Sequence, residues 1–330
     1  DYLCFGCETD SIDLLNTVAE ILINEPKEYK DLLTINLKTG ISFPKARAKA
    51  LDEYFKKYNL DYSPDINSKK YAKYPSDITS NSNLDINTFI NQPNNILGIE
   101  YIKALMRFNS KINPVPLKRL GAGYHSLDTR TKLASATGIR TAMANKDNIS
   151  GLLPDNCLNI IKNHTTIEYN DFSTVLGSKL LSMDTLDHIE GINQDLSNRI
   201  ANNKYNFTDI ETFIPMLQSK NYTYSAISRA LLHIILDIKT DAIKEFISNN
   251  YVNYAMILGF NKNTGILSEI NKYTKIPLVS KFATFYKEAD NNQRKMLDIN
   301  LKADNLYRMI YMNKTSETLP TEFQRQIIIK

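Results

Sequence analysis

The fold is decided by residues 94–117, which read NNILGIEYIKALMRFNSKINPVPL. Apolar residues recur at helical spacing from Ile99 to Phe108, and the run from Ile112 to Leu117 is typical of a strand. An earlier apolar run, DYLCFG at residues 1–6, predicts a strand that ends at a glycine. Because Ser135 is suited to begin another helix, the order strand, helix, strand, helix predicts an α/β fold with parallel strands.

Two more helices are expected before the deciding stretch, at residues 11–22 and 43–58, where apolar residues also recur at helical spacing. Pro44 suits the first turn of the second one. The stretch 61–83 is polar, contains two prolines and shows no periodicity, so we expect a surface loop there.

The pattern becomes mainly helical beyond Gly151, so we expect two domains, at residues 1–150 and 151–330. A small pair of strands is expected at residues 252–260 and 276–279. The amphipathic segments that predict helices in the second domain are residues 171–182, 208–218, 224–238 and 293–311.

The composition indicates an ordered intracellular protein. The chain has 330 residues, of which 42% are hydrophobic, enough for about two domains. It contains neither a run of about 18 apolar residues nor a basic-then-apolar leader, which argues against a membrane span and a secretory signal. Three cysteines, an odd number, fit a reducing compartment. We therefore expect a cytoplasmic protein.

Cys4 and Cys7 form a C-x-x-C spacing, which would suit redox chemistry or half of a zinc site. No second cysteine pair follows, and the motif lies in an apolar run instead of opening a helix. We therefore interpret both as buried cysteines of a strand.

Positive charge is concentrated between Tyr101 and Ser150. This segment has nine basic and two acidic residues, a local excess of +7 that exceeds the net charge of +4 of the whole chain. Such a block attracts phosphates, either of a nucleotide or of a nucleic-acid backbone.

The motif SATGIR at residues 135–140 combines two hydroxyls, a helix start and a cation. Ser135, Thr137 and the free N–H groups of a first helical turn can cradle phosphate oxygens, and Arg140 supplies a forked cation. An ordinary serine N-cap would use the same sequence, so both interpretations stay open.

Two further stretches could contact a ligand. KRLGAGYH at residues 118–125 follows a predicted strand, and ligands of open α/β sheets lie beyond the carboxyl ends of strands; a solvated glycine turn is the alternative. Asn94, in PNNILG at residues 93–98, could cap a helix or form a hydrogen bond with an adenine or a ribose.

Arg229 and His233 lie four residues apart in the helical half, so they share one helix face. With nearby tyrosines they could contact RNA through stacking and phosphate pairing, although such a helix could also simply pack its apolar residues inward. The four histidines have no zinc-like spacing, so a metal hydrolase is not indicated.

Several blocks in the same order closely resemble the bacterial tRNA(Met) cytidine acetate ligases, which belong to the nucleotidyltransferase superfamily. The resemblance spans nearly the whole chain. It implies a partial Rossmann-like nucleotidyltransferase domain followed by a mainly helical, tRNA-binding domain. The blocks are DYLCFGCE at residues 1–8, QPNNILGIEYIKAL at 92–105, KRLGAGYH at 118–125, LASATGIR at 133–140, SAISRALLHIIL at 225–236 and AMILGF at 255–260.

The resemblance implies an enzyme that adenylates acetate with ATP and passes the acetyl group to N4 of the wobble cytidine of elongator tRNA(Met). It implies ATP contacts at Gly6, Asn94 and Arg119, and a phosphate-gripping motif at Ser135, Thr137 and Arg140. Arg119 and Arg140 are then the expected catalytic residues, because they would neutralise charge on the phosphates as pyrophosphate leaves. Mg²⁺ is expected to accompany ATP, although no acidic ligand pair indicates it.

We expect Lys118, Arg229 and His233 to contact the tRNA, and no obligate protein partner is evident. The family's first strand and its N-P-F-H-x-G-H-like motif do not occur in these 330 residues, so the chain is interpreted as a fragment with part of the ATP site. Two other functions stay open. One is a small-molecule adenylyltransferase of the same superfamily, and the other, for the fragment alone, is a non-enzymatic RNA-binding module.

Overall fold

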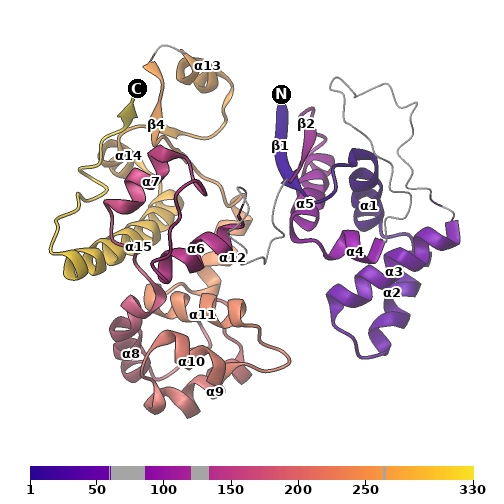
Figure 1. The fold of residues 1–330 in the computed structure, drawn as a ribbon, viewed down its shortest axis with the longest axis horizontal. Helices are drawn as coiled ribbons and strands as arrows, with labels where there is room; N and C mark the ends of the chain where they lie inside the picture. The colour runs from indigo at the N-terminus through magenta and orange to yellow at the C-terminus, as the bar shows by residue number, and fades with distance from the viewer. Residues whose placement is uncertain (59, 61–85, 120–133, 263–264) are drawn as a thin grey trace. The chain divides into compact units, whose positions relative to one another are not determined.

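The computed structural model describes residues 1–58, 60, 86–119, 134–262 and 265–330, and it divides into two compact units, Asp1–Leu158 and Asn159–Lys330 (Figure 1). The expected loop at residues 61–83 and the glycines and histidine of KRLGAGYH lie outside the described residues. The elements of the first unit, with the helix that runs across its end, are β1 (Tyr2–Cys7), α1 (Ile12–Asn24), α2 (Lys27–Lys38), α3 (Phe43–Tyr58), α4 (Ile86–Asn91), α5 (Pro93–Arg107), β2 (Asn113–Lys118), α6 (Ala136–Ala144) and α7 (Asp155–Lys162).

The two strands of the first unit are parallel, as the sequence predicts. β1 pairs with β2 in a register that runs from Tyr2 opposite Asn113 to Cys7 opposite Lys118. The backbone N–H of Arg119 donates to the carbonyl of Cys7 at 2.8 Å, which continues the pairing by one step. Both strands therefore end together, and their carboxyl ends place Gly6 and Arg119 side by side.

Helices α1 and α5 pack beside this strand pair because each presents an apolar stripe. On α1, Leu15 and Val18 are fully buried, and on α5 so are Ile99 and Ile102. Ser11 caps α1 by accepting from the N–H of Leu14, which confirms the helix expected from residue 11. The same core includes Phe5 and Cys7 from β1, so strand and helices share one hydrophobic interior.

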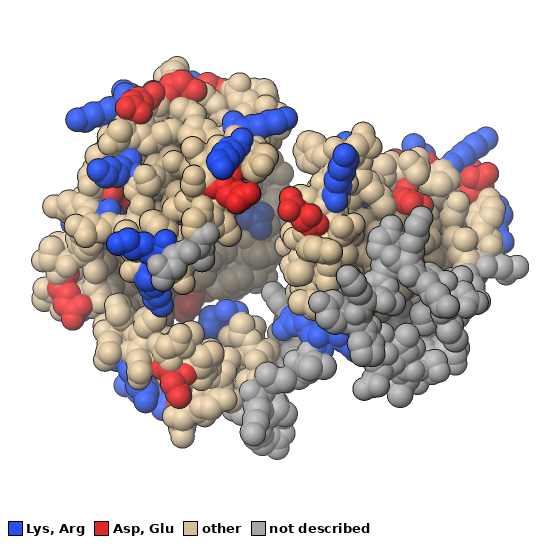
Figure 2. Space-filling model, turned by 90° about the horizontal axis from the view of Figure 1, so that it is seen from above, with Lys and Arg blue, Asp and Glu red and all other residues tan. Residues whose placement is uncertain are grey.

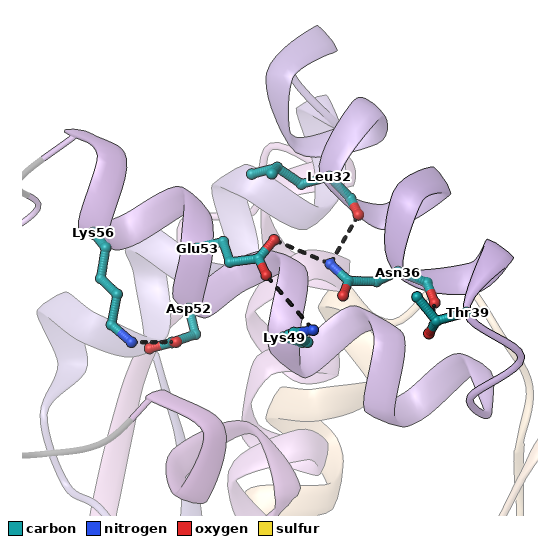
Figure 3. A network of polar contacts seen from close by, with 7 residues as sticks. All are labelled: Leu32, Asn36, Thr39, Lys49, Asp52, Glu53 and Lys56. Carbon is teal, nitrogen blue, oxygen red and sulfur yellow. Dashed lines mark hydrogen bonds and ion pairs between the residues drawn. The ribbon is translucent and has the colours of Figure 1, made fainter.

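Helices α2 and α3 pair through a buried polar contact (Figure 3). Asn36 is 2% exposed, and its Nδ2 donates to the Leu32 carbonyl at 2.9 Å and to Glu53 Oε2 at 3.1 Å. One turn apart on α3, Lys56 pairs with Asp52 at 2.6 Å. A buried amide needs hydrogen-bond partners. The contact between Asn36 and Glu53 therefore favours the alignment of α2 and α3 that supplies them.

Two expectations need correction, and two helices of the first unit were not expected. Helix α5 begins at Pro93 instead of Ile99, because proline is favoured in the first turn and the chain is already helical at Asn94. Cys4 is exposed, because side chains alternate along β1 and only Cys7 faces the core. The helices α2 and α4 were not expected from the sequence.

Among the described residues, no group of three His, Cys, Asp or Glu side chains could hold a metal ion.

The second unit is built mainly from helices, as the sequence predicts. Its central core lies among α8, α9, α10 and α11, where Leu176, Ile200, Ile214 and Ile234 are fully buried. The elements are the 3₁₀ helix Tyr169–Phe172, α8 (Ser173–Ser182), α9 (Gln194–Asn203), the 3₁₀ helix Lys204–Asn206, α10 (Ile210–Leu217), α11 (Tyr224–Leu236), α12 (Thr240–Ser248), β3 (Ala255–Met256), β4 (Gly259–Phe260), α13 (Ile266–Tyr273), β5 (Leu278–Val279), α14 (Phe282–Glu288), α15 (Asn291–Thr315) and β6 (Ile328–Ile329).

The expected small strand pair is present, since β3 pairs with β5 in parallel. A second short pair, β4 with β6, was not expected. None of the helices in the described ranges is long and apolar enough to cross a membrane.

Candidate nucleotide-binding site

A cavity of about 430 Å³ opens at the carboxyl end of β1, and it brings together three residues singled out from the sequence: Gly6, Asn94 and Arg119. These come from β1, from the first turn of α5 and from the residue after β2. This is the place where parallel α/β sheets bind ligands. The described residues that line the cavity are Leu3, Cys4, Phe5, Gly6, Asn94, Leu97, Tyr101 and Arg119.

The side chain of Arg119 lies over Gly6. Gly6 is exposed on β1, and a Cβ at this position would lie 3.5 Å from Cγ of Arg119 and 3.8 Å from its Cδ. The aliphatic stem of the arginine therefore passes directly over the glycine. The main chain of Arg119 is held by Cys7, and the residue lines the cavity. A guanidinium is a group that can form bidentate hydrogen bonds with a phosphate.

Apolar and aromatic side chains form another wall of the cavity. Tyr101 packs edge-on against Phe5, with ring centroids 5.7 Å apart, and it is 41% exposed. Leu97, one turn earlier on α5, is 50% exposed. A flat apolar group such as a nucleobase can bury surface against these side chains. The cavity thus combines an apolar wall with a cation.

Asn94 is held by the carboxylate of Glu8, just after β1. Glu8 Oε1 accepts from Asn94 Nδ2 at 2.6 Å, and Glu8 Oε2 accepts from the backbone N–H of Asn95 at 3.0 Å. In return, Oδ1 of the fully buried Asn95 accepts from the N–H groups of Glu8 and Thr9, both at 3.0 Å. The end of β1 and the start of α5 are therefore joined by hydrogen bonds in which each segment both donates and accepts.

Sequence reasoning missed Glu8, Asn95 and Tyr101. Glu8 belongs to the block DYLCFGCE, but nothing in the local sequence indicates that it contacts Asn94. Asn95 and Tyr101 belong to the block that contains Asn94. The signal for Tyr101 was its helical spacing from Leu97.

The motif at residues 135–140 forms a capped helix start. Ser135 is 3% exposed, and its Oγ accepts from the N–H of Gly138 at 2.9 Å, as an N-cap does. Thr137 is half-buried and Arg140 is exposed on α6. None of these three is among the described residues that line the cavity, so their phosphate role stays a prediction.

The residues expected to contact RNA differ in how they are held. Lys118 and Arg229 are exposed. His233 is half-buried, and its Nδ1 lies 2.8 Å from the carbonyl oxygen of Glu190. Since a carbonyl only accepts, Nδ1 of His233 carries a proton there. Figure 2 shows basic side chains in several separate groups between acidic ones on the face drawn.

The strand pair, the glycine at its end and the asparagine and arginine around the cavity give this α/β protein a candidate nucleotide-binding site. The chain belongs to the HIGH Nucleotidyl Transferase family, whose model matches residues 1–322. This confirms the superfamily resemblance noted from the sequence.

Known relatives agree with this family. The chain is 31% identical to the tRNA(Met) cytidine acetate ligase of Halothermothrix orenii, over 94% of this chain and 72% of the relative. It is 29% identical to the same enzyme of Acetivibrio thermocellus, over 100% of this chain and 77% of the relative. The crystal structures of Thermotoga maritima TmcAL, one without ligand and one bound with alpha-thio ATP, match with a TM-score of 0.80 and 25% identity, over 99% of this chain and 76% of theirs.

Proposed function

We propose that this protein is an ATP-dependent ligase that modifies RNA. In this reaction, a carboxylate oxygen of acetate attacks the α-phosphorus of ATP, and the bond to the departing pyrophosphate breaks. The N4 amine of the wobble cytidine in elongator tRNA(Met) then attacks the acetyl carbon, AMP leaves, and the amine loses a proton. The product is N4-acetylcytidine.

The observation that carries the proposal is the cavity formed by Gly6, Asn94 and Arg119. It supports ATP binding because it offers an apolar wall and a guanidinium in a fold that matches the TmcAL structure bound with alpha-thio ATP. Arg119 would stabilise the negative charge that accumulates on the phosphates as pyrophosphate leaves, and such stabilisation is usually the largest contribution to this kind of transfer. Arg140 is proposed for the same task from α6.

We include Mg²⁺ in the proposal because ATP phosphates commonly bind it. We place the protein in the cytoplasm, where a tRNA-modifying enzyme meets its substrate. For the tRNA itself, the proposed contacts are Lys118, Arg229 and His233, of which the two exposed cations suit phosphate oxygens.

The test uses the protein expressed from the gene that encodes this chain. Acetate-dependent exchange of pyrophosphate with ATP, measured without tRNA, reports adenylation. Mass spectrometry of digested tRNA reports N4-acetylcytidine. We expect both signals with elongator tRNA(Met), and no acetylcytidine when the wobble cytidine is replaced by uridine. Exchange that requires a phosphorylated metabolite instead of acetate would indicate an adenylyltransferase, and salt-dependent tRNA binding without exchange would indicate an RNA-binding module.

A further inference from the structure

The amide of Asn94 has a defined orientation in the cavity. Its Nδ2 lies 2.6 Å from Oε1 of Glu8. An ionised carboxylate can only accept a hydrogen bond, so the amide atom facing Glu8 must be the nitrogen. This chemical argument fixes which end of the amide is which, a choice that ordinarily depends on the surrounding network. The carbonyl oxygen of Asn94 is therefore on the side away from Glu8.

Glu8 is itself fixed in place. Its carboxylate accepts from the backbone N–H groups of Asn94 and Asn95, at 3.4 and 3.0 Å, in the first turn of α5. These are helix N-terminal donors that would otherwise lack partners, and the helix dipole favours a negative charge at this end. Gln92, the N-cap residue, forms no side-chain cap, so Glu8 performs that function from another segment of the chain.

Asn95 prevents the backbone of Glu8 from moving away. Its side chain is fully buried, and its Oδ1 holds the N–H groups of Glu8 and Thr9. Its Nδ2 donates to Gln92 Oε1 at 2.7 Å and to the Phe89 carbonyl at 3.1 Å. A buried polar network in which each member has its partners is rigid. Rotation of the Glu8 carboxylate would leave several of these groups unpaired.

Asn94 lines the cavity, and Glu8 is not among the described residues that do. Within the part of the chain that the structure describes, Oδ1 of Asn94 accepts no hydrogen bond, and the residue is only half-buried. The amide nitrogen of Asn94 therefore donates to Glu8, and its carbonyl oxygen can accept a hydrogen bond from a ligand.

We infer that Glu8 is a positioning residue that makes Asn94 a hydrogen-bond acceptor for the nucleotide. The ligand group that Asn94 recognises must then be a donor, which in ATP means the 6-amino group of adenine or a ribose hydroxyl. This inference rests on the proposed function, because it takes ATP as the ligand of the cavity. A phosphate oxygen, which only accepts, is not the partner of Asn94.

The experiment measures the dissociation constants of four nucleotides by calorimetry: ATP, 2′-deoxy-ATP, 3′-deoxy-ATP and purine riboside triphosphate, which lacks the 6-amino group. One net hydrogen bond corresponds to roughly a tenfold change in affinity. We expect one of the three analogues to bind the wild-type protein about tenfold more weakly than ATP because it lacks the donor. In N94A that analogue should bind as well as ATP does, because the acceptor is gone.

E8Q tests the positioning role. Glutamine has the size of Glu8, and its single oxygen can still accept from one of the two backbone N–H groups. Its amide can face Asn94 with either end, so the preference for ATP over the critical analogue should shrink. E100Q, an exposed glutamate paired with Lys103 on the same helix, is the matched control and should keep the wild-type preference. Thermal unfolding midpoints identify any variant that does not fold.

An unchanged ranking of the four nucleotides in N94A overturns the inference, even if E8Q does not fold. A wild-type ranking in folded E8Q overturns the positioning role of Glu8. A wild-type protein that binds ATP but shows no acetate-dependent exchange overturns the proposed function alone. A wild-type protein that binds no ATP overturns both.

Discussion

The ring of Phe5 lies directly against the backbone of Gly98, so that a Cβ built on this glycine would be 2.6 Å from Cε2 of Phe5. Phe5 belongs to β1 and Gly98 to α5. The absence of a side chain at Gly98 lets the helix approach the strand closely. Since Asn94 lies one turn before Gly98, this contact determines how near the amide lies to the end of β1.

Replacing Gly98 with alanine should therefore destabilise the first unit and widen the cavity. Forcing a methyl group against Phe5 costs about 1 to 3 kcal/mol, of which the better helix propensity of alanine recovers about 1 kcal/mol. Urea unfolding measures the loss. The control is Gly177→Ala on α8, where the nearest atom of Phe207 would be 3.1 Å away, so the loss of stability should be smaller than in G98A. A G98A protein that is more stable than the wild type would contradict this account.

Replacing Arg119 with alanine should weaken ATP binding by about 10- to 100-fold, since a hydrogen bond to a charged group contributes roughly 1.5 to 3 kcal/mol. Arg119→Lys keeps the positive charge but loses the two parallel N–H donors of the guanidinium, so its affinity for ATP should lie between those of R119A and the wild type. Arg107→Ala, an exposed arginine near the end of α5, removes the same charge away from the cavity. Loss of affinity in R107A as large as in R119A would indicate a general charge effect.

Much of this site could be predicted from the sequence because its strongest signals are local. The glycine at the end of β1 and the arginine after β2 follow apolar runs of strand length, and parallel strands bring their carboxyl ends together. Gly6 and Arg119, which the family resemblance names as ATP contacts, therefore lie side by side. The start of α5 was misplaced because the apolar periodicity becomes clear only from Ile99, whereas Pro93 already begins the helix.

The role of Glu8 could not be predicted in the same way. Glu8 and Asn94 are 86 positions apart, and nothing in either local sequence indicates that they meet. A glutamate after a strand is usually solvated, and an asparagine near a helix start usually caps that helix itself. Here the cap comes from across the fold. Such a contact depends on how close the strand and the helix pack, which Gly98 decides.

Replacing Ser135 with alanine should lower the free energy of unfolding by about 1 kcal/mol, because its hydroxyl caps α6. Arg140→Ala, on the exposed side of the same helix, should leave stability nearly unchanged and slow the acetate-dependent exchange. Denaturant unfolding and the exchange assay separate the two effects. A stable S135A protein with impaired exchange would show that the serine acts on the phosphates more than on the helix.

His233→Ala should lower the free energy of unfolding by roughly 0.5 to 1.5 kcal/mol, because the ring loses its hydrogen bond to the Glu190 carbonyl. Arg229→Ala should leave stability unchanged and weaken tRNA binding, with a smaller dependence of affinity on salt. Lys244→Ala, an exposed cation on α12, is the control for charge. Filter binding of elongator tRNA(Met) at several salt concentrations measures the effect, and equal slopes for R229A and the wild type would exclude Arg229 from the RNA contact.

The stability of the protein should fall as the pH rises from about 9 to about 11 because of Cys7. Burial raises the pKa of the Cys7 thiol from its ordinary value of 9.0 to about 11, and the nearby carboxylates of Asp10 and Glu8 act in the same direction. In that window the unfolded chain releases the thiol proton while the folded chain retains it, so unfolding becomes more favourable with each step in pH.

Cys7→Ala removes this dependence. Relative to the wild type, the variant should gain roughly 2 to 3 kcal/mol of stability between pH 8.5 and pH 11.5, since one pKa unit corresponds to about 1.4 kcal/mol. Cys4→Ala is the matched control, because Cys4 is exposed on the same strand. Urea unfolding across this range measures the difference. If wild-type and C7A curves stay parallel through pH 11, then Cys7 ionises in the folded protein and the end of β1 is open to solvent.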